Sequence, residues 1–387
     1  MTDLQPEALL AEARTATGLD DFGPDTFREG LTVLCDSLNR EAYLNALGDA
    51  ALPGMLVGSL SNRLKVVDWI ARHPEVARER IERPIVVIGM FRAGTTLLSR
   101  LFDQDPRNRA LLMWEAGDSA PPSTPADHRS GPRVDAVHAH NAMLAEINPM
   151  IEVVHHEQAD EATECITVMG QEFKSLTYEA VANVPGYDQW LLGVDHRSAY
   201  EYHRSVLQVL QSGGVRGRWT LKSPHHAIAL ESLTQIYPDA HLVLLHRDPV
   251  VLTASVCSLI STLSSTFSDA DHRAYIAAHW PAMLEESIRR IETFRAAHPE
   301  RRIVDVQYAD LVTDPAGTVA SVYAACDDVL DDVGAKAIAS YVEAHPKGQF
   351  GTHRYDVTEF GLDPGELAER FADYIARYGV AREFPAG

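Results

Sequence analysis

The chain has 387 residues, of which 45% are hydrophobic and 23% are charged. This globular balance excludes a disordered, collagen-like or fibrous chain, and the length allows one large α/β domain or two smaller ones. Asp and Glu outnumber Lys and Arg by 55 to 34, which gives a net charge of −21 and argues against nucleic acid as a partner.

Residues 1–80 have a helical pattern. Apolar side chains recur there at the spacing of one helix face, as in Leu9, Leu10 and Ala13 and again in Phe27, Leu31 and Leu34. No strand pattern interrupts them. We therefore predict a helical N-terminal subdomain over 1–80, followed by an α/β domain over 81–387.

Strand and helix patterns alternate after residue 84. Pro84 to Gly89 is a short β-branched run, typical of a strand buried on both faces, and a helical stretch follows from Thr95. Further strands are predicted at 218–222, 241–246 and 302–306, and helices at 227–237, after 249 and at 363–378. A mostly helical insertion or lid is predicted at about 117–211, and it carries many carboxylates, Glu164 among them. The alternation predicts a three-layer α/β fold with a central parallel sheet.

Two features bear on the cellular setting. The four cysteines, Cys35, Cys165, Cys257 and Cys326, lie far apart and form no CxxC pair, which fits reduced thiols rather than a disulfide framework or a zinc site. The first residues form no apolar signal segment, and no run of 18 apolar residues occurs. We expect a cytoplasmic protein without a transmembrane segment.

The segment Gly89 to Thr96 has the spacing of a Walker A loop, but Thr95 stands where that motif has lysine. A tight loop at a helix N-terminus points backbone N–H groups at an anion. The cation lies inside the loop instead, at Arg92. The loop therefore suits one phosphate with a neighbouring anionic group better than ordinary ATP chemistry, and a purely structural turn is the alternative.

Two more groups of polar residues follow predicted strands. Arg247 comes directly after one strand, and Ser255 lies eight residues further on; the alternative is a salt bridge that caps the strand end. Lys222, His225 and His226 follow another strand and offer a charge and a base. The histidine pair has no third ligand at metal-site spacing, so we predict no metal.

Together these motifs resemble the sulfotransferases that use PAPS (3′-phosphoadenosine 5′-phosphosulfate). Residues 84–96 resemble their 5′-phosphosulfate loop, and Arg247 with Ser255 is similar to their 3′-phosphate pair. The segment 308–315 resembles the YxDLxxDP segment of the family. The bacterial branch has counterparts of 345–351, 353–355, His156-Glu157 and Trp190-Leu191. The resemblance runs from about residue 84 to 380, and it implies a P-loop-like α/β fold.

The resemblance implies roles for these residues. The 5′-phosphate would lie on the loop amides of Arg92, Ala93, Gly94, Thr95 and Thr96. Arg92 would face the bridge to the leaving phosphate. The 3′-phosphate would be bound by Arg247 and Ser255 and covered by Lys347 and Gly348, and 3′,5′-bisphosphoadenosine would be the product. The loop departs from the usual Pro-Arg-Ser-Gly at Phe91, which we expect to relax the backbone, and at Ala93, which lacks a phosphate-binding hydroxyl.

The expected reaction is transfer of a sulfuryl group to a hydroxyl of a small molecule, lipid or glycan. Arg92 and Lys222 would stabilise the developing charge without a metal. The resemblance offers Glu115 and His226 as competing general bases, with His156 next. The side chains of Trp114, Phe173 and Trp190 are either acceptor-pocket lining or plain core.

Two other functions remain open from the sequence. A P-loop nucleotide or small-molecule kinase would need the missing lysine and a magnesium ligand, for which Asp248 is the one placed candidate. An inactive binding protein of the same fold would be consistent with Phe91 and Ala93. A homodimer is a further expectation, since soluble enzymes of this size often form symmetric dimers.

Overall fold

The computed structural model describes residues 3–151, 157–345 and 357–383. Its centre is a five-stranded sheet in the order β2-β3-β1-β4-β5, and every neighbouring pair of strands is parallel. The strands are β1 (Ile85–Gly89), β2 (Asn108–Ala110), β3 (Arg218–Ser223), β4 (His241–His246) and β5 (Ile303–Gln307). The four predicted strands are confirmed within one or two residues, and β2 is the strand that the sequence did not reveal.

Helices precede, connect and follow the strands. The N-terminal part contains α1 (Pro6–Thr17), η1 (Asp25–Phe27), α2 (Arg28–Glu41), α3 (Ala46–Arg72) and η2 (Pro74–Arg78). Between β1 and β3 lie α4 (Thr95–Asp103), α5 (Met113–Gly117), α6 (Pro132–Ile147), α8 (Ile166–Gly170), α9 (Pro185–Gly193) and α10 (Arg197–Ser212). The predicted insertion is therefore only partly helical.

The remaining helices complete the fold. After β3 come η3 (Pro224–Ile228), α11 (Leu230–Ile236), α12 (Pro249–Phe267) and α13 (Arg273–Ala297). After β5 come α14 (Tyr308–Thr313), α15 (Pro315–Ala325), α16 (Asp332–Ala344), η4 (Val357–Phe360), α17 (Pro364–Arg370) and α18 (Ala372–Tyr378). Two predicted helices, at 227–237 and 363–378, are each divided in two; the second is interrupted at Phe371, where the backbone leaves the α region.

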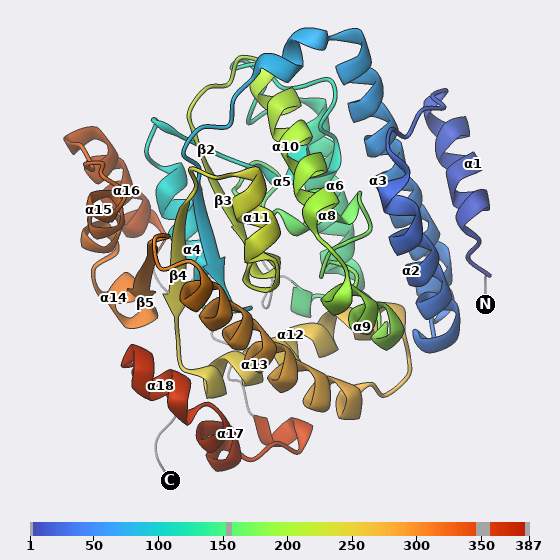
Figure 1. The fold of residues 1–387 in the computed structure, drawn as a ribbon. Coiled ribbons are helices and arrows are strands. Elements are labelled where there is room, and N and C mark those ends of the chain that lie inside the picture. Colours follow the sequence, from blue (N-terminus) through green and yellow to red (C-terminus); the bar gives the residue numbers. More distant parts are fainter. Residues whose placement is uncertain (1–2, 152–156, 346–356, 384–387) are drawn as a thin grey trace.

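Alternate residues of β1 enter two different hydrophobic cores. Val86 and Ile88 belong to a core with α10, α11 and the N-terminal helices, whereas Ile85 and Val87 belong to a core with α4, α15 and the C-terminal helices. Since successive strand residues face opposite sides, the sheet is covered by helices on both faces. Figure 1 shows this three-layer α/β arrangement, which confirms the predicted fold class.

The N-terminal helices pack against the rest of the chain. Arg63 of α3 forms a buried ion pair with Glu172, with 2.5 Å between Nη1 and Oε2, and it also donates to the backbone oxygen of Phe22. Figure 1 shows α1, α2 and α3 on the side of the molecule away from β5. The boundary between 1–80 and 81–387 falls in the connection between η2 and β1, and the division into two domains stays a prediction.

Helix α12 combines length with high hydropathy. It is the one helix of the described ranges that is long and apolar enough to cross a membrane, yet 67% of its most apolar window is buried inside the protein. It packs against α13 and α3. In this fold α12 is therefore a core helix that extends from the end of β4.

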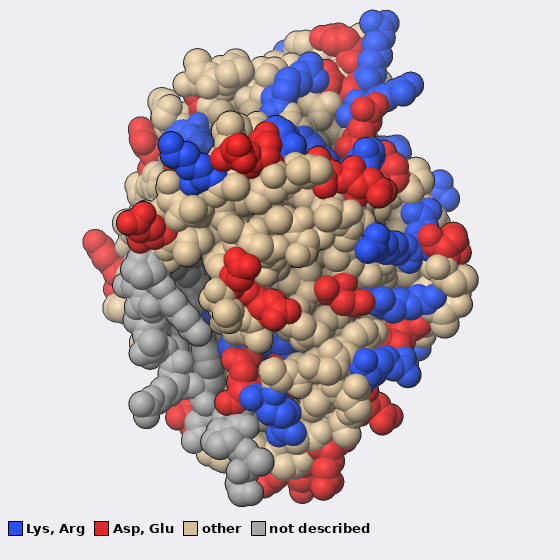
Figure 2. Space-filling view, turned by 90° about the vertical axis from the view of Figure 1, so that its left-hand side faces the viewer, with Lys and Arg blue, Asp and Glu red and all other residues tan. Residues whose placement is uncertain are grey.

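One face of the surface is shown in Figure 2. Lys and Arg side chains are scattered there among Asp and Glu, and broad areas belong to other residues. Among the described residues of this face, the basic side chains do not merge into the continuous field that a duplex-binding protein uses.

Candidate active site

The loop between β1 and α4 is held close to neighbouring atoms. Gly94 has φ 100°, and a Cβ there would lie 2.7 Å from the ring of Tyr308. A Cβ at Gly89 would lie 2.5 Å from Cγ2 of Thr95. Both positions therefore require glycine, and α4 begins directly after Gly94, where the first N–H groups of a helix have no intrahelical acceptor.

Of the two unusual loop residues, Ala93 is buried, whereas Phe91 is partly buried and lines the pocket beside the loop. The ring of Phe91 packs edge-on against Trp280 of α13, with 4.9 Å between ring centroids. Ala93 is fully buried, and its N–H donates to the oxygen of Met90 at 3.2 Å. Phe91 thus anchors the loop on α13 through its ring, a contact that the sequence did not reveal, and its effect on the backbone stays a prediction.

Three of the predicted binding residues lie together. Nε of Arg92 donates to Oγ of Ser255 at 3.0 Å, and Nη1 of Arg247 donates to the backbone oxygen of Arg92 at 2.9 Å. The guanidinium of Arg247 also lies 4.0 Å from the centre of the Tyr308 ring and forms a two-pronged ion pair with Glu383, at 2.8 and 3.0 Å. The loop, β4 and α12 thereby converge on one corner.

Lys222 extends from the end of β3 toward the same loop. Its Nζ lies 3.1 Å from Oγ1 of Thr96 and 3.1 Å from Oε1 of Glu164, and the lysine side chain is buried. A pocket of about 260 Å³ opens here, and its polar lining comprises Arg92, Thr95, Thr96, Glu164, Arg247 and Tyr308. Among the described residues that line this pocket, Glu164 is the one carboxylate.

Glu115 has a different environment from the one expected of a base. Its side chain is fully buried, pairs with Arg109 at 2.8 and 3.0 Å, and accepts a hydrogen bond from Ser123 at 2.7 Å. Burial would raise the pKa of Glu115, but the charge of Arg109 and the nearby ring of His128 lower it to about 2. Glu115 does not line the loop pocket, so it lies in an interior ion pair.

The histidines after β3 are interior as well. His226 Nδ1 lies 2.8 Å from the hydroxyl of Tyr200, and His225 Nε2 lies 3.1 Å from Nδ1 of His196. Burial lowers the pKa of both His225 and His226 well below the usual value. Their neighbour Pro224 lines the loop pocket, whereas neither histidine does.

Several sequence-based candidates have other places. His156, Lys347 and Gly348 lie outside the described residues. None of the three aromatic candidates lines the loop pocket. Trp114 and Phe173 are core residues, and Nε1 of Trp190 donates a hydrogen bond to Glu29. Sequence reasoning did not single out Glu164, because its proximity to Lys222 arises from chain packing across 58 residues.

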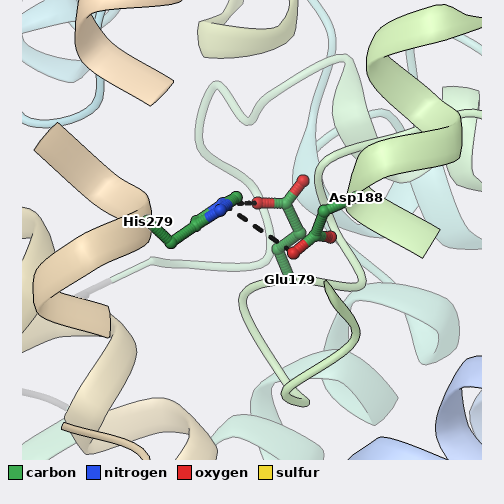
Figure 3. A group of neighbouring side chains, drawn as sticks. All are labelled: Glu179, Asp188 and His279. Atoms are coloured by element: carbon green, nitrogen blue, oxygen red, sulfur yellow. Dashed lines mark hydrogen bonds and ion pairs between the residues drawn. The ribbon is translucent and has the colours of Figure 1, made fainter. Parts of the chain in front are cut away.

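A buried acidic group separate from the lining of the loop pocket is shown in Figure 3. Glu179, Asp188 and His279 each offer a ligand atom within 4.8 Å of the others, an arrangement that a divalent cation could use. The ring of His279 lies 3.0 Å from Glu179, and Tyr275 donates to Asp188. Burial raises the pKa of Glu179 to about 8, and that of Asp188 well above its usual range. Protonated carboxyl groups are an equally good account of this group, and the absence of a metal stays a prediction.

Comparison with known proteins gives a consistent result. The profile of a family described as "Sulfotransferase family" matches residues 84–332. An omega-hydroxy-beta-dihydromenaquinone-9 sulfotransferase of Mycobacterium tuberculosis is 24% identical over 314 residues, which cover 78% of this chain and 76% of that protein.

Two crystal structures match nearly the whole chain. Sulfotransferase STF9 from Mycobacterium avium has 29% identity and a TM-score of 0.90, and the match covers 97% of both chains. Sulfotransferase STF1 from Mycobacterium tuberculosis has 34% identity and a TM-score of 0.85, and the match covers 96% of this chain and 99% of that one.

Proposed function

The chain belongs to the sulfotransferase family, and from this premise we propose that it transfers a sulfuryl group from PAPS to a hydroxyl of an acceptor. One observation carries the choice of donor. The loop has no lysine at the Walker position, and its cation, Arg92, is joined to both Ser255 and Arg247. This corner presents two guanidinium groups and a hydroxyl next to a helix N-terminus, which suits a nucleotide with phosphates at two positions.

The residues present fit such a donor. The loop amides from Arg92 to Thr96 would hold its 5′-phosphate, because they lie at the N-terminus of α4. Arg247 and Ser255 would hold the 3′-phosphate, and Arg92 would lie between the two phosphates. Lys347 and Gly348 stay predictions from the resemblance.

The proposed reaction is an in-line displacement at sulfur. The acceptor oxygen forms a bond to sulfur while the bond between sulfur and the 5′-phosphate oxygen breaks, and 3′,5′-bisphosphoadenosine leaves. Negative charge grows on the leaving oxygen, and the cations of Arg92 and Lys222 would stabilise it. Arg92 lines the pocket, and Lys222 contacts two of its lining residues, Thr96 and Glu164, at 3.1 Å, so both cations are held in place before the reaction begins.

The geometry favours Glu164 over Glu115 and His226 as the base. The carboxylate of Glu164 lines the loop pocket and lies 3.1 Å from Nζ of Lys222, whereas Glu115 and His226 are buried elsewhere with their own partners. A base must reach the acceptor hydroxyl, so its place in the pocket matters more than its intrinsic pKa. The acceptor proton would pass to Glu164.

The other two functions receive less support. Asp248, the magnesium candidate of a kinase, is fully buried and caps α12 by accepting from the N–H of Val250 at 3.0 Å. An inactive binding protein would be suggested by a collapsed loop, but the loop is open: Phe91 rests its ring on Trp280 and, with Arg92, lines a pocket of about 260 Å³. All four cysteines are free and buried, in keeping with the proposed cytoplasmic location, and a homodimer stays a prediction.

The proposal is tested by incubating the protein with radiolabelled PAPS and a panel of hydroxylated acceptors, with a metal chelator present. Transfer of label to an acceptor is expected, and Arg92→Ala should abolish it. Arg197→Ala, at an exposed arginine of α10, is the matched control and should leave the transfer unchanged. Transfer of phosphate from ATP in the presence of magnesium, without any sulfuryl transfer, would support the kinase instead.

A further inference from the structure

An apolar pocket of about 650 Å³ lies between α3, α6 and the end of α12. It is much larger than the loop pocket and falls within the range typical of ligand sites. Each of the three helices contributes apolar side chains: Leu47 and Met55 from α3, Met143 and Ile147 from α6, and Leu263 and Phe267 from α12. Only a few polar residues line it.

The walls of this pocket expose large apolar side chains to solvent. Among the described residues, seven large hydrophobic side chains are exposed, and three of them line this pocket: Met55 at 37%, Met143 at 48% and Ile147 at 44%. Met150, just after α6, is a fourth at 41%. Clustered exposure of this kind marks a surface that binds an apolar partner.

The apolar pocket adjoins the loop pocket. Leu263 of α12 lines both, and of two consecutive residues Ala180 lines the loop pocket while Val181 lines the apolar one. The loop pocket is itself apolar on this side, where Leu259 and Ile260 contribute to its wall. The two pockets therefore share part of their wall.

We propose that this pocket binds the hydrocarbon part of a hydroxylated lipid and so presents its hydroxyl to the loop pocket. The assignment rests on the proposed sulfuryl transfer and narrows its acceptor to one class. A glycan would need many converging hydrogen-bonding groups, whereas the polar lining here is limited to His140, Asn141 and Glu157. Burial of methylene groups against the three helices would supply most of the affinity.

Gly54 offers a way to fill the pocket without disturbing the core. It lies on α3 in the lining, and a Cβ added there would meet no atom within 4 Å. Replacing glycine inside a helix by leucine also improves helix propensity, so Gly54→Leu should fold. Gly58, one turn further along α3, has equally open space but does not line the pocket, which makes Gly58→Leu the matched control.

Binding is measured without any donor, through the fluorescence of N-phenyl-1-naphthylamine and its displacement by primary alcohols from hexanol to dodecanol. The dissociation constant should fall by about fourfold for each added methylene, as burial of about 0.8 kcal/mol per group implies. Gly54→Leu should weaken binding of the longer alcohols at least tenfold, while Gly58→Leu should match the unmodified protein. Both variants should bind 3′,5′-bisphosphoadenosine normally.

Two results would overturn the assignment: affinity that is independent of chain length, or equal affinity in Gly54→Leu and Gly58→Leu. A third contrary result comes from sedimentation at the same concentrations. If probe binding disappears as the protein self-associates, a second copy of the chain covers the pocket. If binding depends on chain length but no label is transferred from PAPS, the result supports the lipid pocket and refutes the proposed sulfuryl transfer.

Discussion

Nε of Arg92 donates to Oγ of Ser255 at 3.0 Å, although 163 residues separate the two in the sequence. This bond ties the loop after β1 to the second turn of α12. Since Arg247 bonds the backbone oxygen of the same Arg92, the two predicted phosphate subsites share one arginine. Binding at one subsite should therefore depend on the other.

The first prediction concerns this link. Ser255→Ala removes a hydrogen bond to a charged group, for which about 1.5–3 kcal/mol is typical, so the affinity for 3′,5′-bisphosphoadenosine should fall at least about tenfold. The affinity for AMP should change much less. Titration calorimetry measures both, and Ser258→Ala on the same helix is the matched control. Equal losses for the two nucleotides would assign Ser255 to the 5′-phosphate.

The second prediction concerns Glu383, whose carboxylate pairs with the guanidinium of Arg247. If Arg247 binds the 3′-phosphate, Glu383 competes with the ligand. Glu383→Gln should then tighten bisphosphate binding by up to about fivefold, the scale of a partly exposed ion pair, and Arg247→Ala should weaken it strongly. Glu366→Gln on α17 serves as the control. Weaker binding in Glu383→Gln would show that the pair supports the site.

The third prediction separates Glu164 from Glu115. Glu164→Gln should lower kcat by about 10²- to 10⁴-fold, the usual range for loss of a general base, with little change in the dissociation constant of 3′,5′-bisphosphoadenosine. Steady-state kinetics and calorimetry provide the two values. A fully active Glu164→Gln protein would exclude this residue as the base.

The fourth prediction is that Glu115 supports the fold. Glu115→Gln leaves Arg109 in the interior without its counter-charge, and breaking a buried pair in this way typically costs about 3–5 kcal/mol of the free energy of unfolding. Urea unfolding measures the loss. A variant that keeps its stability but loses kcat would return Glu115 to the role of base.

The fifth prediction concerns pH. The folded protein holds a proton on Glu179 up to a pKa of about 8, whereas the usual value is 4.5, so the free energy of unfolding should fall as the pH rises toward 8. Burial also lowers the pKa of His279 below its usual value of 6.5, which makes the free energy of unfolding rise with pH below 6.5. The effect of Glu179 is therefore unopposed by His279 between pH 6.5 and 8. Asp188 contributes in the same direction as Glu179.

Glu179→Gln is neutral at every pH, so it should flatten this slope and be more stable than the unmodified protein above pH 8. Urea unfolding between pH 6.5 and 9 measures the effect, with Glu300→Gln on the surface as the control. A divalent cation held by the group would reverse the expectation, because Glu179→Gln would then lose a ligand and become less stable.

The sequence predicted those features that depend on contiguous residues. The β-branched run of β1 and the glycines of the loop that follows are local signals, and both were placed correctly. Strand β2 was missed because Asn108, Arg109 and Ala110 have no strand pattern of their own and become a strand by pairing with β3.

The polar partners were harder to predict. The spacing of Glu115 after the loop helix does not reveal that Arg109, six residues earlier, pairs with it in the interior. Glu164 reaches the pocket because the N–H of the next residue, Cys165, bonds the backbone oxygen of Lys222 at 2.9 Å. Such long-range contacts leave no trace in local spacing.

The most direct test of the proposed donor is thermal unfolding with 3′,5′-bisphosphoadenosine, AMP or Mg·ATP at equal concentrations. A ligand at a hundred times its dissociation constant stabilises the folded state by about 2.7 kcal/mol, which gives a clear rise in Tm. The account predicts a large rise with the bisphosphate and a small one with AMP, because only the former reaches Arg247 and Ser255. A rise with Mg·ATP alone would contradict it and favour the kinase.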